Sequence, residues 1–245
     1  MRVAVFGSSR NTTPKPYLDE AFKLGARLAK EGMVCTNGGG GQGVMGAAND
    51  GVRSANGKII GVIHEMFCVD NDEDRKIANM IKATGNDLNE RKQLLMDNAD
   101  CFVIMPGGTG TFDELWDIVS HRSLGMKGLK GKEIIIVNLD GFYDGSIMQL
   151  KRAFNDKILY NPIESYFTVV ANGDEAFEII QRQRALLEKS NSRSSSSSQV
   201  DSRITSRASN SIVGSSAPSA VLVGSLCFAA GLGLASFLAA RKQSR

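Results

Sequence analysis

Residues 105–117 combine a glycine-rich loop with an acidic side chain, at a spacing that suits the binding of a phosphate. The segment reads Met-Pro-Gly-Gly-Thr-Gly-Thr-Phe-Asp-Glu-Leu-Trp-Asp and follows the apolar run 101–105, which is typical of a buried parallel strand. Apolar residues then recur at helical spacing, so the glycines lie where a strand ends and a helix begins. Unpaired amides and the positive end of the helix dipole make such a position an anion site. We expect a phosphate on the amides of residues 107–111.

The spacing of these glycines differs from two common phosphate loops. It is neither the Gly-x-Gly-x-x-Gly of dinucleotide-binding proteins nor the P-loop, which ends in Lys-Ser/Thr. The pattern is Pro-Gly-Gly-x-Gly-Thr-x-x-Glu, from Pro106 to Glu114. It places the Glu114 carboxylate one turn into the helix, beside the anion site. The same residues also fit a capping box, in which the Thr111 hydroxyl and Glu114 satisfy the first amides. A catalytic carboxylate and a helix cap are both open at this point.

A basic pair, Arg91-Lys92, precedes this loop in the chain. Arg91 falls on the apolar stripe of the helix expected over residues 87–98. An arginine on an inward face is costly unless an anion meets it. The partner is either a phosphate or carboxylate at the site, or a structural salt bridge to Asp113 or Asp117.

Together with this basic pair, the loop resembles the LONELY GUY (LOG) family of cytokinin riboside 5′-monophosphate phosphoribohydrolases, often mislabelled lysine decarboxylases. The likeness covers roughly residues 1–188. Four more segments resemble the family in the right order, namely residues 5–9, 37–46, 124–125 and 138–143. The resemblance implies hydrolysis of the N-glycosidic bond of cytokinin (N6-substituted adenosine) riboside 5′-monophosphates. The products would be the free base and ribose 5-phosphate.

The resemblance also implies which residues act. The reaction passes through an oxocarbenium-like state, so it needs negative charge near the anomeric carbon and a positioned water. Arg91 and Glu114 would form the catalytic pair, with Glu114 stabilising the ribosyl cation and orienting water, and Arg91 holding Glu114 and contacting the ribose or phosphate. A plain nucleoside should be a poor substrate, because phosphate binding positions the sugar. The substrate-binding residues would be Gly7, Ser8, Gly39, Gly40, Glu73, Lys92, Gly107, Gly108, Thr109, Gly110, Thr111 and Ser120.

Some features depart from the family pattern and concern the pocket for the base. His64 stands where Ile-Pro is usual, Asn37 where tyrosine is common, and residues 68–76 are unusually acidic. One alternative is therefore a general purine nucleoside 5′-monophosphate nucleosidase of salvage. Another is a non-catalytic nucleotide-binding or carrier module, against which the presence of both Arg91 and Glu114 argues. We expect no cofactor and no metal, since the two histidines lack metal-ligand spacing and nothing marks a pyridoxal phosphate lysine.

The elements that must position these residues alternate between strands and helices. Strands are expected over residues 2–6, 33–36, 58–62, 80–84, 101–105, 133–137 and 167–170, and helices over 17–31, 44–54, 87–98, 111–124, 143–154 and 174–188. This alternation predicts an α/β fold with a Rossmann-like doubly wound parallel sheet. Ligands of such sheets bind at the carboxyl ends of the strands, where the loops at residues 7–9, 38–43 and 107–110 would meet. The alternative to ligand binding for these loops is that they are tight turns that need positive φ. For Gly43 and Gly46, the alternative is packing of the helix against the sheet.

Composition divides the chain into four parts. Residues 1–189 have a globular mixture and would form the LOG catalytic domain. Residues 190–218 are serine-rich with almost no large apolar side chains, which predicts a disordered linker. Residues 219–240 are uncharged and apolar for long enough to cross a membrane, which predicts a C-terminal transmembrane anchor, with a helix docked on the domain as the alternative. Residues 241–245 form a short basic tail.

Charge and cysteine usage bear on partners and location. Residues 190–245 carry six basic residues and one acidic residue, so their net charge is +5, which leaves −2 of the chain's total of +3 for residues 1–189. No nucleic-acid surface is therefore expected. The cysteines lack Cys-x-x-Cys spacing and no signal peptide is visible, so we expect a domain facing the cytosol. The basic tail favours a mitochondrial or peroxisomal outer surface over the endoplasmic reticulum, and the resemblance implies a homodimer.

Overall fold

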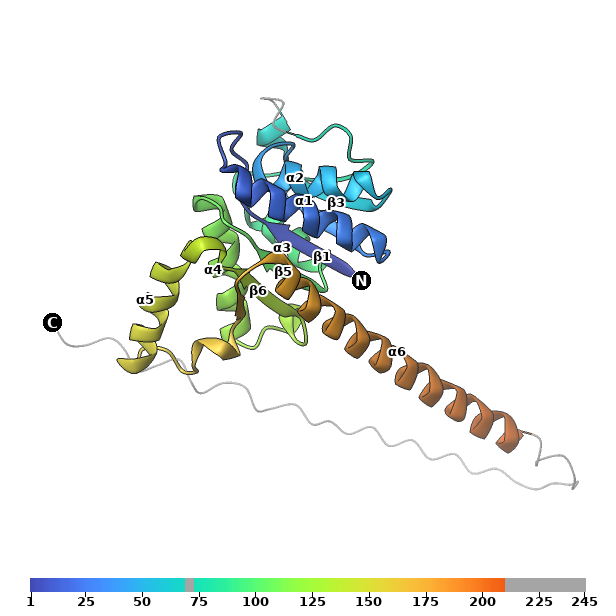
Figure 1. Ribbon diagram of the computed structural model, residues 1–245. Helices are drawn as coiled ribbons and strands as arrows, with labels where there is room; N and C mark the ends of the chain where they lie inside the picture. The colour runs from blue at the N-terminus through green and yellow to red at the C-terminus, as the bar shows by residue number, and fades with distance from the viewer. Residues whose placement is uncertain (69–72, 210–245) are drawn as a thin grey trace, which may run out of the picture. The chain divides into compact units, whose positions relative to one another are not determined.

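The computed structural model describes residues 1–68 and 73–209 of the 245-residue chain. Strands and helices alternate along this part (Figure 1). The strands are β1 (Arg2–Phe6), β2 (Val34–Asn37), β3 (Lys58–His64), β4 (Asn79–Ala83), β5 (Cys101–Ile104), β6 (Glu133–Val137) and β7 (Thr168–Val170). The α-helices are α1 (Lys15–Lys30), α2 (Gly43–Ser54), α3 (Asn89–Asp97), α4 (Thr109–Ser123), α5 (Asp144–Asn155) and α6 (Gly173–Ser209).

The strands form one parallel sheet in the order β4-β3-β2-β1-β5-β6-β7. The chain builds the sheet outward from β1 to β4, and then returns to the other side of β1 with β5. Val3 of β1 is accordingly paired with Cys35 of β2 and with Cys101 of β5. Such a reversal is a topological switch point, where open α/β sheets bind their ligands. The predicted Rossmann-like parallel sheet is confirmed.

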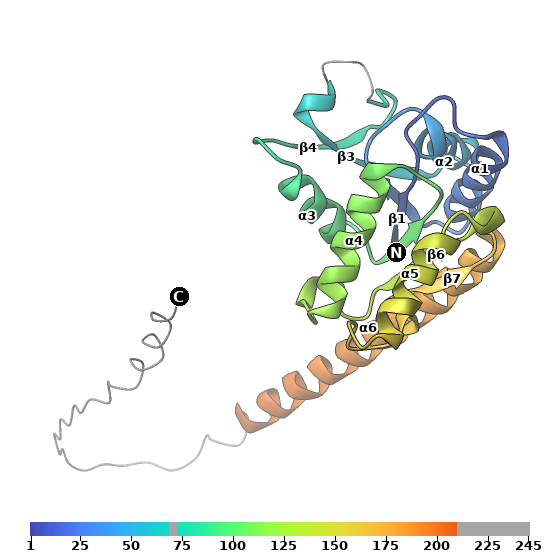
Figure 2. The ribbon, with the colours of Figure 1, turned by 90° about the vertical axis from the view of Figure 1, so that its left-hand side faces the viewer.

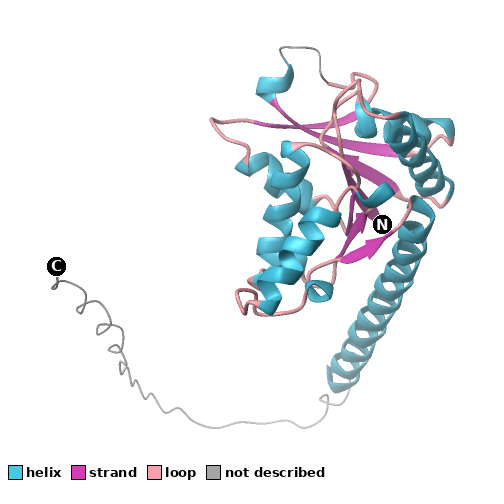
Figure 3. Cartoon of the chain, turned by 60° about the vertical axis from the view of Figure 1, so that its left-hand side comes forward, coloured by secondary structure: helices cyan, strands magenta, loops and turns pink. Residues whose placement is uncertain are grey.

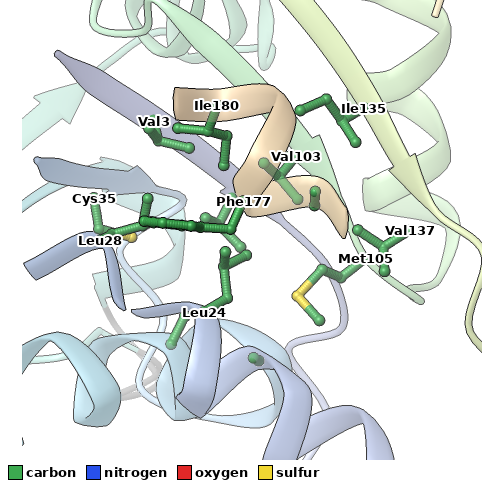
Figure 4. Packing of buried hydrophobic residues seen from close by; sticks show 14 of the residues in the cluster. Val3, Leu24, Leu28, Cys35, Val103, Met105, Ile135, Val137, Phe177 and Ile180 are labelled. Carbon is green, nitrogen blue, oxygen red and sulfur yellow. The ribbon is translucent and has the colours of Figure 1, made fainter. Parts of the chain in front are cut away.

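Helices cover both faces of the sheet. Side chains along each strand alternate between the two faces, so each strand contributes to both cores. Val3 and Val5 of β1 pack with α1, α2 and α6, where Leu24 and Phe177 fill the core (Figure 4). Phe6 on the opposite face packs with residues of α3 and α4. Figure 2 shows α3 and α4 on one side of β1 and α1 on the other, and Figure 3 shows helices on both sides of the strands. Ile147 and Leu150 of α5 pack in the same core as α3 and α4.

Every predicted strand and helix is present, and the ends differ by at most two residues except at the C-terminal end of α6. Helix α4 begins at Thr109 rather than at residue 111, because the extended backbone of Gly108 forms its N-cap. Helix α6 continues from Gly173 to Ser209, well past the expected end at Glu188. Serine lies only slightly below average in helix propensity, so a serine-rich segment can extend an existing helix.

The C-terminal part of the chain is described only up to Ser209. The chain consists of two compact units, residues 1–195 and 196–245. The boundary between them is close to residue 189, the predicted end of the domain. Helix α6 therefore runs into the range 190–218, for which a linker was expected, and the linker stays a prediction. Among the described residues, no helix has the length and apolar character needed to cross a membrane. The predicted span, residues 219–240, lies outside the described residues.

Candidate active site at the switch point

The loops that follow β1 and β5 meet at the carboxyl edge of the sheet. The Ser8 amide donates to the Pro106 carbonyl at 3.0 Å, which joins the two loops across the switch point. A cavity of about 220 Å³ opens between them. It is lined by Ser8, Arg10, Thr12, Thr13, Pro14, Tyr17, Pro106, Gly107 and Phe142. The cavity lies at the edge where the topology predicts a ligand site, but only two of the three predicted loops line it, because residues 38–43 do not contribute to it.

The N-terminus of α4 is open on one side of this cavity. Its N-cap, Gly108, forms no side-chain cap bond, and the first amides of any helix lack partners within the helix. Gly108, Thr109 and Gly110 are exposed, and a Cβ atom on either glycine would meet nothing within 4 Å. Thr111 differs, because it is buried and its Oγ1 would lie 2.2 Å from a Cβ on Gly107. An anion can reach the amides of this turn from solvent.

Glu114 forms an ion pair with Arg91 rather than a capping box. The Arg91 Nη1 atom lies 3.1 Å from Glu114 Oε1, and the two side chains are only 11% and 12% exposed. Arg91 Nε also donates to the Val62 carbonyl at 3.1 Å. The guanidinium is thus fixed between β3 and α4, and the capping-box alternative is excluded by the position of the N-cap at Gly108.

The salt bridges considered for Arg91 belong to its neighbour. Lys92 Nζ lies 3.1 Å from Asp113 Oδ1 and 3.8 Å from Asp117 Oδ1. Of the two alternatives for Arg91, the structure therefore shows the carboxylate at the site, and not the bridge to Asp113 or Asp117. Lys92 thus pairs with these two acids, and Arg91 pairs with Glu114.

Burial sets the acidity of Glu114. Removal from water raises the pKa of its carboxyl group above the ordinary value of 4.5, while the Arg91 guanidinium acts in the opposite direction. A carboxylate with a raised pKa accepts a proton more readily than an exposed one. The pair can therefore supply negative charge and also a base at one point of the site.

The second glycine loop, which joins β2 to α2, has a different role. Gly43 has a φ of +60°, and a Cβ on it would lie 2.3 Å from the Ser8 carbonyl oxygen. That carbonyl accepts the Val44 amide at 2.7 Å, so it occupies the N-terminus of α2. A Cβ on Gly46 would similarly lie 2.3 Å from the Gly41 carbonyl oxygen. Packing, against loop carbonyls rather than the sheet, accounts for both glycines.

A buried polar network holds this loop in place. Asn37 accepts the Gly39 amide at 2.9 Å and donates to Asn49 at 2.7 Å. Asn49 in turn donates to the Gly40 carbonyl at 3.2 Å and to Asp74 at 3.1 Å. Gly39 and Gly40, predicted to bind substrate, are buried within this network. The asparagine that replaces the usual tyrosine at position 37 is thus a structural anchor of the loop.

Gly38 of the same loop contributes to the site by its lack of a side chain. A Cβ at this position would lie 2.2 Å from Arg91 Nη2. Any larger residue would displace the guanidinium from Glu114. The β2–α2 loop therefore shapes the Arg91–Glu114 pair without offering an open helix terminus.

The remaining predicted residues are spread along this edge and beyond it. Ser8 joins three elements, since its hydroxyl oxygen accepts bonds from the Arg10 amide and the Thr13 hydroxyl in addition to its backbone bonds. Glu73 pairs with Arg75 at 3.2 Å. Ser120 is exposed on α4, about 9 Å along the helix axis from Glu114, so a single copy of the chain does not bring it to the pair.

Two groups of residues near the site were missed by the sequence reasoning. Arg10, Thr13, Tyr17 and Phe142 line the cavity, and the only sequence signal was the place of Arg10 two residues after Ser8. The segment 138–143, noted only as a family likeness, contacts the start of the glycine loop 106–110. Its Tyr143 hydroxyl donates to the Met105 carbonyl at 2.8 Å, one residue before Pro106.

The fold and site define a Rossmann-like α/β protein with an open helix N-terminus beside a buried Arg–Glu pair. A family model described as "Possible lysine decarboxylase" matches residues 45–180. A cytokinin riboside 5′-monophosphate phosphoribohydrolase of Mycobacterium marinum is 31% identical over 72% of this chain and 91% of its own. The Arabidopsis thaliana enzyme LOG5 is 29% identical over 75% of this chain and 77% of its own. The chain belongs to this family, which is the LOG family that its motifs resemble.

Solved structures share the fold. The molybdenum cofactor carrier protein of Chlamydomonas reinhardtii superposes with a TM-score of 0.54 at 22% identity, over 75% of this chain and 98% of that protein. The molybdenum cofactor binding protein of Rippkaea orientalis gives 0.53 at 20% identity, over 74% and 94%. At these identities the likeness is one of fold alone.

Proposed function

We propose that this protein hydrolyses the N-glycosidic bond of cytokinin riboside 5′-monophosphates. The observation that carries the proposal is the buried Arg91–Glu114 pair, in which Arg91 Nη1 lies 3.1 Å from Glu114 Oε1. Glu114 belongs to α4, the helix with the open N-terminus, and Arg91 reaches it from α3. A protein that only binds nucleotides needs the anion site but not a desolvated carboxylate next to it. The relatives that are named as phosphoribohydrolases give the substrate class.

The 5′-phosphate binds at the N-terminus of α4. The amides of residues 109–111 and the helix dipole attract the anion, and the open space at Gly108 and Gly110 lets it approach the backbone. Arg10 lines the adjacent cavity and adds a positive charge. Because this remote contact positions the sugar, a nucleoside without the phosphate loses rate as well as affinity.

The phosphate and the pair together place the anomeric carbon beside Glu114. The bond from this carbon to the base breaks, and the base leaves with the electron pair. The Glu114 carboxylate stabilises the ribosyl cation and takes a proton from the water whose oxygen bonds to the carbon. Water thus supplies the new hydroxyl group of ribose 5-phosphate and the proton on the free base. Arg91 holds the carboxylate in position.

The test is base release by the full chain from isopentenyladenosine 5′-monophosphate, AMP and isopentenyladenosine. We expect release from the prenylated monophosphate, and a loss of about a thousandfold in Glu114→Gln. Asp113→Asn is the matched control, since Asp113 is half exposed and pairs with Lys92 rather than Arg91. Comparable release from AMP would assign the protein to purine salvage. No release from any monophosphate would contradict hydrolysis and favour a binding module.

We also propose that residues 219–240 anchor the protein to a membrane and that it forms a homodimer. The uncharged apolar character of residues 219–240 supports the anchor, and exposed apolar side chains on and after α5, among them Met148, Ile158 and Tyr160, support an interface. Recovery of the full chain in the soluble fraction without detergent would contradict the anchor. A monomer of undiminished activity in light scattering would contradict the dimer.

A further inference from the structure

His64 lies at the carboxyl edge of the sheet with a buried nitrogen that the proposed mechanism does not use. It is the last residue of β3 and is 2% exposed. Val62, two residues earlier, belongs to the core on the face covered by α3 and α4. Since side chains two apart on a strand share a face, His64 lies on the same face as the helices that carry Arg91 and Glu114.

The hydrogen bonding of the imidazole fixes which nitrogen is the donor. Nδ1 faces the Met66 amide at 3.2 Å and accepts its hydrogen. An accepting Nδ1 leaves the ring proton on Nε2. Nε2 has no hydrogen-bond partner among the described residues. Buried polar groups are nearly always paired, so a buried N–H without a partner indicates a missing acceptor.

An aromatic ring connects His64 to the catalytic pair. The Phe67 ring lies 6.5 Å from the His64 ring, at an interplanar angle of 77°. The Arg91 guanidinium lies 5.9 Å from the centre of the same Phe67 ring. Arg91 binds Glu114 on its other side. His64 and Phe67 therefore flank the pair on the side of β3, whereas the phosphate site flanks it on the side of the α4 N-terminus.

We propose that His64 determines base specificity by donating its Nε2–H to a ring nitrogen of the purine, with Phe67 as the aromatic wall of the base pocket. The inference rests on the proposed function, which places the anomeric carbon at Glu114 and the phosphate at α4. The base must then extend from Glu114 away from the phosphate. Ring nitrogens of a purine are acceptors, whereas the exocyclic amine, which carries the N6 substituent, offers mainly a donor.

This role has a consequence that a structural histidine would not show. In the free protein the unpartnered N–H costs stability, so His64→Phe should raise the melting temperature, by about 2–4 °C. The Met66 amide loses its acceptor in this variant but lies in an exposed residue that water can reach. The same substitution should weaken nucleotide binding by about tenfold, the value of one hydrogen bond. Stability and affinity would change in opposite directions.

The experiment measures calorimetric Kd values on the full-length Glu114→Gln protein, with and without His64→Phe. The ligands are AMP and its 1-deaza, 3-deaza and 7-deaza analogues, with ribose 5-phosphate as the ligand that lacks a base. We expect His64→Phe to weaken AMP and two of the analogues about tenfold, and to leave ribose 5-phosphate unchanged. The analogue that lacks the accepting nitrogen should bind weakly to both proteins and show no further loss. His64→Gln, which retains an N–H donor, should recover part of the affinity.

The remaining outcomes separate this inference from the proposed function. His121→Gln, the change of the other histidine, should leave the analogue series unaltered. Equal losses for every analogue and for ribose 5-phosphate, or a lowered melting temperature with unchanged Kd values, would overturn the role of His64. So would binding of ribose 5-phosphate without any binding of AMP. If the wild-type chain releases no base while the coupling to one nitrogen persists, hydrolysis is contradicted and the base contact stands.

Discussion

Two glycine loops at the same edge of the sheet lead into helices, and the protein uses them in opposite ways. Before α2, the Ser8 carbonyl accepts the Val44 amide and fills the helix N-terminus. Before α4, Gly108 and Gly110 are exposed and no side chain caps the helix. The first loop is framework, and the second is the proposed ligand site.

The difference teaches that glycine content alone does not mark a phosphate site. Gly43 is required because its positive φ and the approach of a carbonyl leave no room for a side chain. Gly108 and Gly110 have room for a side chain in the free protein, so their lack of one matters only when a ligand arrives. The space around each missing Cβ therefore separates glycines that the fold needs from glycines that the ligand needs.

The largest effect should come from Gly43→Ala. The left-handed backbone costs about 1 kcal/mol for alanine, and the clash with the Ser8 carbonyl should bring the loss of stability to about 3 kcal/mol or more. Gly125→Ala is the control, because Gly125 also has positive φ, +67°, but its Cβ would meet nothing within 4 Å. Chemical denaturation measures both. Equal losses for the two variants would show that the Ser8 contact is unimportant.

A smaller loss is expected from Asp74→Asn, which tests the network behind the framework loop. Asp74 Oδ2 accepts bonds from Asn49 and from Arg53, whose Nη1 lies 2.8 Å away. The amide keeps the shape but removes the charge, and Arg53 retains Asp50 at 2.7 Å. We expect roughly 2 kcal/mol of lost stability. Activity per folded molecule should stay near wild type in a kinetic assay, and a large fall in kcat would instead place Asp74 in the site.

The pH dependence of activity should report on Glu114 of α4, and not on the loop between β2 and α2. Because burial raises the pKa of Glu114, its carboxylate forms at a higher pH than that of an ordinary glutamate. Activity should therefore rise by up to tenfold per pH unit through this raised pKa, and level off above it. Stability has the opposite sign: a folded pKa above the unfolded value contributes stability below the unfolded pKa, and this is lost as pH rises through the folded pKa.

The framework variants make this pH prediction sharper. Asp74→Asn should lower stability at every pH without moving the acid limb of kcat/KM, because it does not contact Glu114. Arg91→Lys should move the limb to higher pH, since a lysine reaches the carboxylate less well than the fixed guanidinium. An acid limb at the ordinary glutamate value in the wild-type protein would show that Glu114 is not the group that titrates.

The strands, the helices and the phosphate loop could be predicted from the sequence because their causes are local. Continuous apolar runs indicate strands buried on both faces, and the glycines after 101–105 indicate the turn into α4. The Arg91 and Glu114 pair was expected from the family likeness. Its geometry follows from the sheet, which brings the Val62 carbonyl and α4 to the two ends of one guanidinium.

The remaining features depend on contacts between distant parts of the chain. Three carboxylates, Asp113, Glu114 and Asp117, were candidate partners of Arg91, and only the fold decides that Lys92 pairs with Asp113 and Asp117. The role of Asn37 depends on Asn49, twelve residues away on another element. The residues Arg10 and Phe142 line one cavity because the segment before α5 reaches α1, where the Phe142 ring lies 6.1 Å from the Tyr17 ring. Periodicity and spacing contain no signal for such pairings.

The smallest effect, and the sharpest test of the contrast between the loops, should come from Gly110→Ala. Position 110 is the second residue of α4, where alanine favours the helix, so stability should rise by about 0.5 kcal/mol. The new methyl group stands where the phosphate approaches, and KM for the monophosphate should rise about fivefold. Gly145→Ala is the matched control, because Gly145 is the second residue of α5 and is equally open. It should give the same gain in stability with KM unchanged. If Gly110→Ala leaves KM for the monophosphate unchanged, the anion lies elsewhere, and the open N-terminus of α4 would be no more a ligand site than the filled one of α2.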